Sequence, residues 1–295
     1  MFSVRTLAVS AALAGLAMCA APAQAFVHGA YHIMPTPSYM AKLQKQGHVP
    51  SGLMNYYGGS VFSNSKVVSV LWGSDVNSTI VATIPGFSGA IVNSTYVDQM
   101  AEYGTHLKGI NGHKGTKQDI GRGTYLGQIQ IKPKNKNTTL QDSDVQAELE
   151  HQIKKGVLPP RDLSTLYMVY FPQDITIELD GLTSCIDFGA YHFATIDTKL
   201  SKKNLFYAVE PDCGGSIANI TFAASHEFAE ATTDNVPTPG SNPDFPQAWN
   251  DADGFEIGDK CGGSGQLTAG SSHWTVTQYF LNSTGKCSTG NYTSP

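Results

Sequence analysis

Mostly apolar runs separate segments of helical periodicity along the chain. The runs at residues 67–72, 166–171 and 205–209 are rich in β-branched and aromatic residues, which is typical of strands buried on both faces. Residues 124–131 alternate in part between apolar and polar positions, and residues 273–281 form a late run. The pattern therefore predicts strands at these five places.

Helical spacing marks three segments between the strands. Residues 78–103 predict a helix in pieces, interrupted at Pro85-Gly86. Residues 144–155 place apolar side chains on one face, and a glycine directly after them is the expected C-terminal stop. Residues 216–233 predict the third helix.

The order of these elements favours an α+β fold with a mixed sheet and flanking helices, because strands and helices do not alternate strictly. We expect a single domain over residues 26–295, without internal repeats or long linkers. Residues 26–60 predict an irregular lead-in, residues 61–210 hold most of the sheet and helices, and residues 211–295 hold the last helix and an acidic loop.

The first residues have the pattern of an export signal. Arg5 supplies a positive charge, residues 7–21 are apolar, and the Ala-Gln-Ala at 23–25 suits a signal peptidase. The apolar run is too short for a membrane span, and no later run approaches the roughly 18 apolar residues that one needs. We therefore expect residues 1–25 to be removed and the mature protein, starting near Phe26, to be secreted (extracellular or periplasmic) and free of the membrane.

Composition narrows the classes of function. The chain is 41% hydrophobic, enough to bury a sizeable core, but only 15% charged, with a net charge of −5. Its densest basic stretch, residues 132–136, is short and is expected to be a solvated loop. Nucleic-acid binding is therefore not expected. The sequence does not indicate an oligomeric state.

The cysteines agree with export. Cys19 lies in the predicted signal, which leaves Cys185, Cys213, Cys261 and Cys287. An even number in an oxidising compartment predicts two disulfides. Of the three possible pairings, proximity in the sequence favours 185–213 and 261–287. A four-thiolate zinc site is not expected, since no Cys-x-x-Cys spacing occurs.

The predicted helix at 216–233 contains Ser-His-Glu-Phe-Ala-Glu at residues 225–230. A helix projects His226 and Glu230 from one face about 5–6 Å apart, as two ligands of one metal ion. Glu227 is placed to deprotonate a metal-bound water, as in metalloproteases with His-Glu-x-x-His. Glu at the last position is compatible with zinc, while a harder ligand set also suits manganese or calcium.

A solvated helix face that bears two glutamates and a histidine is the competing interpretation. Residues 216–231 contain neither Lys nor Arg, whereas exposed helix faces often mix both signs of charge. The composition therefore favours a helix buried beside a cleft.

The acidic segment at residues 251–259 is the expected source of a third ligand. Glu256 follows Glu230 after 25 intervening residues, and Asp259 lies three residues beyond it. Gluzincin-type metalloproteases have a Glu ligand roughly twenty residues past the helix motif and an Asp a turn later that steadies a ligand His. We expect Glu256 to bind the metal and Asp259 to support it. A calcium loop is an alternative, although its Glu comes too early for an EF-hand.

Two further interpretations concern the same site. His192, in an Ala-Tyr-His tripeptide, could replace Glu256 and give a ligand set of two His and one Glu. Ser225 adjoins His226, but no Gly-x-Ser-x-Gly elbow accompanies it, so Ser-His-Asp catalysis is not favoured.

Stretches spread over most of residues 55–261 resemble the exordium/phosphate-induced protein family and its bacterial secreted relatives. The stretches are Tyr56-Tyr57-Gly58-Gly59, Val67-Val68-Ser69-Val70-Leu71-Trp72-Gly73-Ser74, Ile120-Gly121-Arg122-Gly123, Leu166-Tyr167-Met168-Val169-Tyr170-Phe171-Pro172, Ala190-Tyr191-His192, His226-Glu227-Phe228-Ala229-Glu230-Ala231-Thr232-Thr233-Asp234 and Glu256-Ile257-Gly258-Asp259-Lys260-Cys261. The resemblance implies a secreted or cell-surface protein, without an established activity. This sequence keeps the His-Glu-x-x-Glu pattern, like the bacterial relatives and unlike the plant members, whose role is tied to growth responses.

These observations lead to one main hypothesis and one alternative. The main hypothesis is a secreted metal-dependent hydrolase, a zincin-like metallopeptidase acting on a peptide or protein. His226, Glu230 and Glu256 would hold a divalent ion, most simply zinc, and Glu227 would activate water. The alternative is a non-catalytic extracellular binding or signalling protein with a structural metal site.

Overall fold

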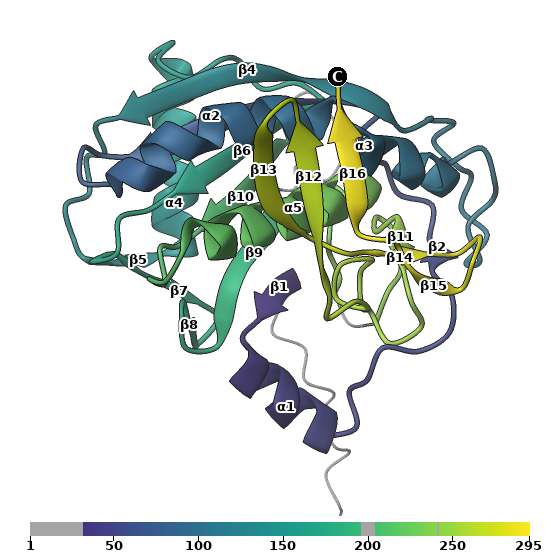
Figure 1. Ribbon diagram of the computed structural model, residues 1–295. Coiled ribbons are helices and arrows are strands. Elements are labelled where there is room, and N and C mark those ends of the chain that lie inside the picture. Colours follow the sequence, from purple (N-terminus) through teal and green to yellow (C-terminus); the bar gives the residue numbers. More distant parts are fainter. Residues whose placement is uncertain (1–31, 196–203, 241) are drawn as a thin grey trace, which may run out of the picture.

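The fold is described from a computed structural model, which places residues 32–195, 204–240 and 242–295 (Figure 1). The predicted export signal at residues 1–25 lies outside these described residues. Within them the architecture is α+β, with a mixed central sheet, flanking helices and four smaller sheets. The predicted α+β class with a mixed sheet is therefore confirmed.

Six strands form the central sheet, in the order β1-β9-β10-β6-β3-β4. β10, β6, β3 and β4 are parallel, whereas β9 and β1 continue one edge in antiparallel pairing. The four predicted strands between residues 67 and 209 are β3, β4, β6 and β10. The strands of this sheet are β1 His32–Pro35, β3 Asn64–Trp72, β4 Gly121–Ile131, β6 Thr165–Tyr170, β9 Phe188–Thr195 and β10 Leu205–Glu210.

Helices cover both faces of the central sheet, because its strand residues alternate between two hydrophobic cores. Leu166 and Met168 of β6 belong to the core that contains side chains of α2 and α5, whereas Tyr167 and Val169 belong to the core that contains side chains of α4. The helices are α1 Pro37–Lys45, α2 Ser78–Val92, α3 Thr95–Gln99 with the 3₁₀ turn η1 Met100–Tyr103, α4 Asp142–Lys154 and α5 Ile217–Thr233.

The predicted interruption at Pro85-Gly86 is wrong, since the helix α2 continues through these residues to Val92. Pro85 has no N–H to donate to the carbonyl of Val81, four residues earlier, and the Gln128 side chain from β4 donates to that carbonyl instead, at 3.1 Å. The break comes at Asn93 and Ser94, and the Ser94 hydroxyl caps α3. No single helix in the described part of the chain is long and apolar enough to cross a membrane; only α2 with the bent continuation α3–η1 passes by length and composition.

The predicted irregular lead-in is wrong for residues 32–45, which form a strand and a helix, whereas residues 46–60 are irregular apart from the two-residue strand Asn55–Tyr56. Residues 32–35 form β1, which pairs with β9 as an edge strand, and α1 follows with Thr36 as its N-cap. The Thr36 side chain accepts a hydrogen bond from the amide of Tyr39, and a proline occupies the first turn. The N-terminal segment therefore belongs to the sheet that carries the site described below.

Four small sheets surround this framework. β12, β13 and β16 form a three-stranded sheet whose strand β13 lies against α5, so that α5 runs between this sheet and the central one (Figure 1). The predicted strand at 273–281 divides into β13 and β14. The strands are β2 Asn55–Tyr56, β5 Thr139–Gln141, β7 Thr176–Leu179, β8 Leu182–Thr183, β11 Trp249–Asn250, β12 Ser264–Ala269, β13 Ser272–Thr277, β14 Phe280–Leu281, β15 Lys286–Cys287 and β16 Asn291–Ser294.

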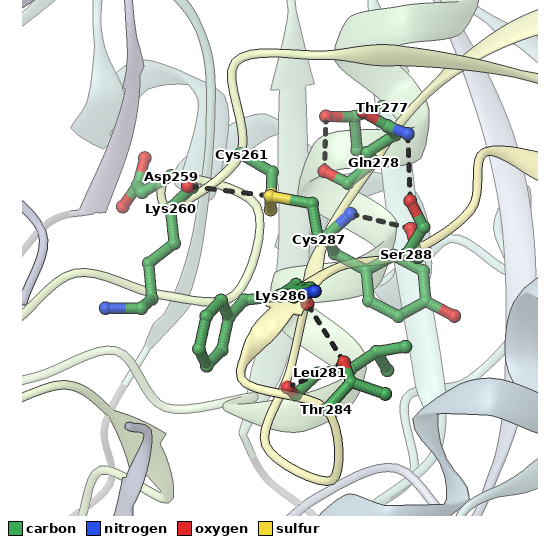
Figure 2. The surroundings of a disulfide bond; sticks show 12 residues. Asp259, Lys260, Cys261, Thr277, Gln278, Leu281, Thr284, Lys286, Cys287 and Ser288 are labelled. Carbon is green, nitrogen blue, oxygen red and sulfur yellow. Dashed lines mark hydrogen bonds between the residues drawn. A yellow bond between two sulfur atoms is a disulfide. The ribbon is translucent and has the colours of Figure 1, made fainter. Parts of the chain in front are cut away.

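Two disulfides are present, with the predicted pairing. Cys185 bonds Cys213, and Cys261 bonds Cys287. Figure 2 shows the second bond, which ties the segment directly after Asp259 to the short strand β15. Disulfides persist in oxidising environments, so this pair is consistent with a protein that leaves the cytosol.

Candidate metal centre

α5 carries the predicted His-Glu-x-x-Glu motif and is buried along most of its length. It packs on β9 and β10 on one side and on β13 on the other, where Thr221 donates a hydrogen bond to the carbonyl of Thr275 at 2.7 Å. His226 is 4% exposed, and Glu227 and Glu230 are 0% exposed. The solvated-face interpretation is therefore wrong.

Two other interpretations also fail on hydrogen bonding. The Ser225 hydroxyl donates to the carbonyl of Phe222 at 2.7 Å and accepts from the amide of Thr277 at 2.8 Å, so it is committed to helix packing and not poised as a nucleophile. The carboxylate of Asp251 accepts hydrogen bonds from two backbone amides of its own turn. It also forms an ion pair with Lys260 at 2.7 Å. Its oxygens stabilise the turn, which removes the first ligand of the calcium-loop alternative.

His226 and Glu230 meet as the helix spacing predicts. His226 Nε2 lies 3.0 Å from Glu230 Oε1 and 3.6 Å from Asp259 Oδ1. These distances suit ion pairs, yet His226 Nε2 and Asp259 Oδ1 have no aligned hydrogen-bond partner among the described residues. A hydrogen bond requires both a short distance and alignment, so these contacts are not hydrogen bonds. Donor atoms close together but not aimed at one another are typical of ligands that converge on an ion.

His192 of β9 enters the centre of the cluster. Its Nδ1 lies 3.2 Å from Glu227 Oε2 and 3.9 Å from Glu230 Oε2, and its Nε2 lies 3.6 Å from Glu256 Oε1. Nε2 also lies 3.1 Å from the backbone carbonyl of Asp234, which can only accept a hydrogen bond. Nε2 therefore carries the proton, and the Nδ1 lone pair faces the carboxylates of α5.

Glu256 and Asp259 come from the acidic loop, as predicted. The amide of Glu256 donates to Asp259 Oδ2 at 3.2 Å, and the amide of Asp259 donates to Glu230 Oε1 at 3.1 Å. The loop is thus docked on α5 through its backbone. Glu256 is 0% exposed, and neither of its side-chain oxygens has a hydrogen-bond partner in the described part of the chain. A buried carboxylate without partners is costly, which points to a missing cation.

His32 is the third histidine of the centre, and its position in the sequence does not predict this. His32 pairs with His192 across β1 and β9, and its Nδ1 lies 3.1 Å from Glu256 Oε2. The side-chain amide of Gln247 lies 3.1 Å from His32 Nε2, so that Nε2 accepts and Nδ1 carries the proton. His32 is therefore placed to orient Glu256 rather than to bind a metal. No local pattern in the sequence signals this role, because it arises from strand pairing.

A second set of buried polar groups supports the centre from the end of α5. The Asp234 carboxylate accepts hydrogen bonds from the amide of Ala248 at 3.0 Å and from the side chain of Asn250 at 2.5 Å. The Gln247 side chain donates to Asn250 at 3.2 Å. These bonds hold the loop after α5 and fix the Asp234 carbonyl that orients His192.

Burial controls the ionisation of the acids. It raises the pKa of Glu227 to about 8 and the pKa of Glu230 to about 7, although the nearby charge of His226 opposes the rise. Burial also raises the pKa of Glu256 well above its ordinary value, and the charge of Glu230 adds to this effect. Without a cation, Glu227 is therefore mostly protonated at pH 7, and Glu230 is about half protonated.

The histidines divide into two kinds. Burial lowers the pKa of His32 to about 4 and lowers the pKa of His192, so both rings are neutral at physiological pH. Burial also disfavours charge on His226, but Glu230 and Asp259 outweigh it and raise the pKa of His226 well above its ordinary value. A proton on His226 thus takes the place that a metal cation would take.

The spacing of the donors fits a divalent metal. Two ligand atoms about 2.1 Å from a tetrahedral ion lie roughly 3.4 Å apart, close to several of the distances above. Two groups of donor atoms lie within 4.8 Å of one another: His192 with Glu230 and Glu256, and His226 with Glu227 and Glu230. The structure thus brings all the predicted site residues together. His192 lies beside Glu256 and does not replace it in the cluster.

The centre is closed by the acidic loop. A Cβ added to Gly258 would lie 2.8 Å from Glu230 Oε1 and 2.8 Å from His226 Nδ1, so only glycine allows the loop backbone to pack this tightly on the two side chains. The candidate ligands therefore have little contact with solvent.

Comparison with protein-family models, curated proteins and solved structures finds no match to this chain. The resemblance to the exordium family therefore stays a prediction, and the function is argued from the site alone.

Proposed function

We propose that the protein is an exported metal-dependent hydrolase with a zincin-like site, acting on peptide bonds. The observation that carries the proposal is the cluster on α5: Glu230 lies 3.0 Å from His226, and Glu227 beside them has an oxygen without a hydrogen-bond partner in the described residues. A divalent ion bound there would polarise a carbonyl group and lower the pKa of a water molecule.

Glu227 is the proton acceptor in this proposal. Its Oε2 lies 3.2 Å from His192 Nδ1, and its Oε1 has no hydrogen-bond partner among the described residues. Glu227 also belongs to the donor group of His226 and Glu230, so it lies within reach of a water molecule that the ion would bind. Glu227 can thus take a proton from water and return it to the leaving amine.

Support for export comes from two sources. The pattern of residues 1–25 predicts a signal peptide, and two disulfides are present. An extracellular or periplasmic hydrolase is consistent with both.

A structural metal site is the second candidate, and the enclosure of the centre favours it. Glu227, Glu230 and Glu256 are 0% exposed, and structural sites are typically closed to solvent. Hydrolysis requires the acidic loop or β1 to move aside and admit a peptide, whereas a structural role does not.

One assay separates the two candidates. The full chain, purified without chelator, is incubated with an unfolded protein and with a broad peptide library, and new amino termini are counted. The proposal predicts cleavage that stops with chelator and returns with added zinc. Intact metal and fold with no cleavage of any substrate would leave the structural role.

A further inference from the structure

The two oxygens of Glu230 face different histidines. Oε1 lies 3.0 Å from His226 Nε2, and Oε2 lies 3.9 Å from His192 Nδ1. A carboxylate held between two ligand groups in this way is a common bridge between two metal ions. We infer that the centre binds two divalent cations, bridged by Glu230, which extends the site of the hydrolase proposed above.

The first cation would be held by His192, Glu230 and Glu256. One donor atom of each lies within 4.8 Å of the others. Glu256 offers two oxygens and Glu230 offers Oε2, and none of these three atoms has a hydrogen-bond partner within the described residues. Because all three residues are at most 1% exposed, water cannot easily satisfy these atoms instead.

The second cation would be held by His226, Glu230 and Asp259. Asp259 Oδ1 lies 3.6 Å from His226 Nε2, and the Asp259 amide bonds Glu230 Oε1 at 3.1 Å, which fixes the loop against the helix. His226 Nε2 and Asp259 Oδ1 are buried and without aligned partners among the placed residues. Glu227 also lies in the donor group of His226 and Glu230, and we assign it to proton transfer and not to ligation, because Asp259 Oδ1 supplies a third donor beside His226.

The charge of the cluster favours two ions over one. Glu227, Glu230, Glu256 and Asp259 bring four carboxylates, each with a side chain at most 6% exposed. In the described structure their ion-pair partners are histidines alone, because the nearby Lys260 pairs with Asp251. Glu210 is a further buried carboxyl group next to Glu227, so one divalent ion would leave most of the negative charge unbalanced and would serve only one of the two donor groups.

A pair of ions suits amide hydrolysis. In two-metal sites one ion positions the attacking water while both stabilise the negative charge that develops on the substrate oxygen. Carboxylate and imidazole donors suit zinc or manganese in such a pair.

The test is the metal stoichiometry of the full chain, stripped with chelator and then titrated with zinc alone or manganese alone. Native mass spectrometry and elemental analysis count the bound ions. We expect two equivalents for the wild-type protein, one for His192→Ala, one for His226→Ala and none for Glu230→Ala. Glu148→Gln is the control and should keep both ions, since Glu148 is a buried carboxyl group of α4 that accepts hydrogen bonds from the Lys134 amide and the Gln152 side chain and lies outside both donor groups.

The wild-type count decides the matter even if a variant fails to fold. Saturation at one equivalent in the zinc titration and also in the manganese titration would overturn the inference. Loss of all metal from a folded His192→Ala or His226→Ala variant would overturn it as well. The outcome is separate from that of the proposed function: two bound ions without hydrolysis contradict only the hydrolase, and hydrolysis with one ion contradicts only the second ion.

Discussion

His32 and His192 lie opposite each other on β1 and β9, and both rings reach the carboxylate of Glu256, at 3.1 Å and 3.6 Å. The pairing makes the N-terminal strand part of the candidate metal centre. Groups that orient a ligand contribute substantially to metal affinity without touching the ion.

His32→Ala should therefore weaken metal binding by about 10–100-fold, the usual effect of losing such a group. The dissociation constant for zinc, measured by competition with a chelator of known affinity, reports the change. His273→Ala is the control, because His273 is exposed on β13 and should have no effect. Equal affinity of His32→Ala and the wild type would show that His32 does not position Glu256.

The metal-free protein should lose stability as the pH rises from 6.5 to 8. Over this range Glu227 and Glu230, with pKa values raised to about 8 and about 7, ionise in the folded state but are already ionised when unfolded. Each of the two groups therefore lowers the free energy of unfolding by up to about 1.4 kcal/mol per pH unit. The raised pKa of His226 also lowers the free energy of unfolding as the pH rises. His32 and His192 have lowered pKa values, so below about pH 6.5 these histidines are protonated in the unfolded chain but not in the folded one. Their effect on stability is opposite in sign, but it is confined to pH values below about 6.5.

Urea unfolding at the two pH values, with and without chelator, measures this slope. Bound metal replaces the protons of the cluster, so the metal-loaded protein should not lose stability over the same range. A metal-free protein that becomes more stable between pH 6.5 and 8 would contradict the assigned burial of these acids.

Gly258→Ala should reduce metal binding while leaving the rest of the fold in place. The new Cβ would lie 2.8 Å from Glu230 Oε1 and His226 Nδ1, so the loop or the ligands must shift. Gly262→Ala is the matched control, because a Cβ there meets nothing within 4 Å. Metal content and circular dichroism together decide: unchanged metal content in Gly258→Ala would mean that the loop does not seal the ligands.

The sequence predicted the features of the centre that depend on local spacing. His226, Glu227 and Glu230 follow from helix periodicity, and Glu256 and Asp259 follow from an acidic run in a loop. It also predicted both disulfides, because the cysteines that pair are near one another in the chain.

The features that it missed depend on contacts between distant residues. His32 joins the site through the pairing of β1 with β9, which residues 26–60 do not signal. The helix α2 survives Pro85 because Gln128, on a strand over forty residues later, bonds the carbonyl that the proline leaves free. Neither contact can be inferred from the periodicity of its own segment.

Comparison of wild-type protein with Glu227→Gln tests the central claim most directly. Glutamine keeps the shape of the side chain but cannot accept the proton, so the account predicts unchanged metal content and thermal stability. Cleavage of an unfolded protein substrate should fall by about 10²–10⁴-fold, the usual contribution of a general base. Cleavage by metal-loaded Glu227→Gln at the wild-type rate would contradict the account.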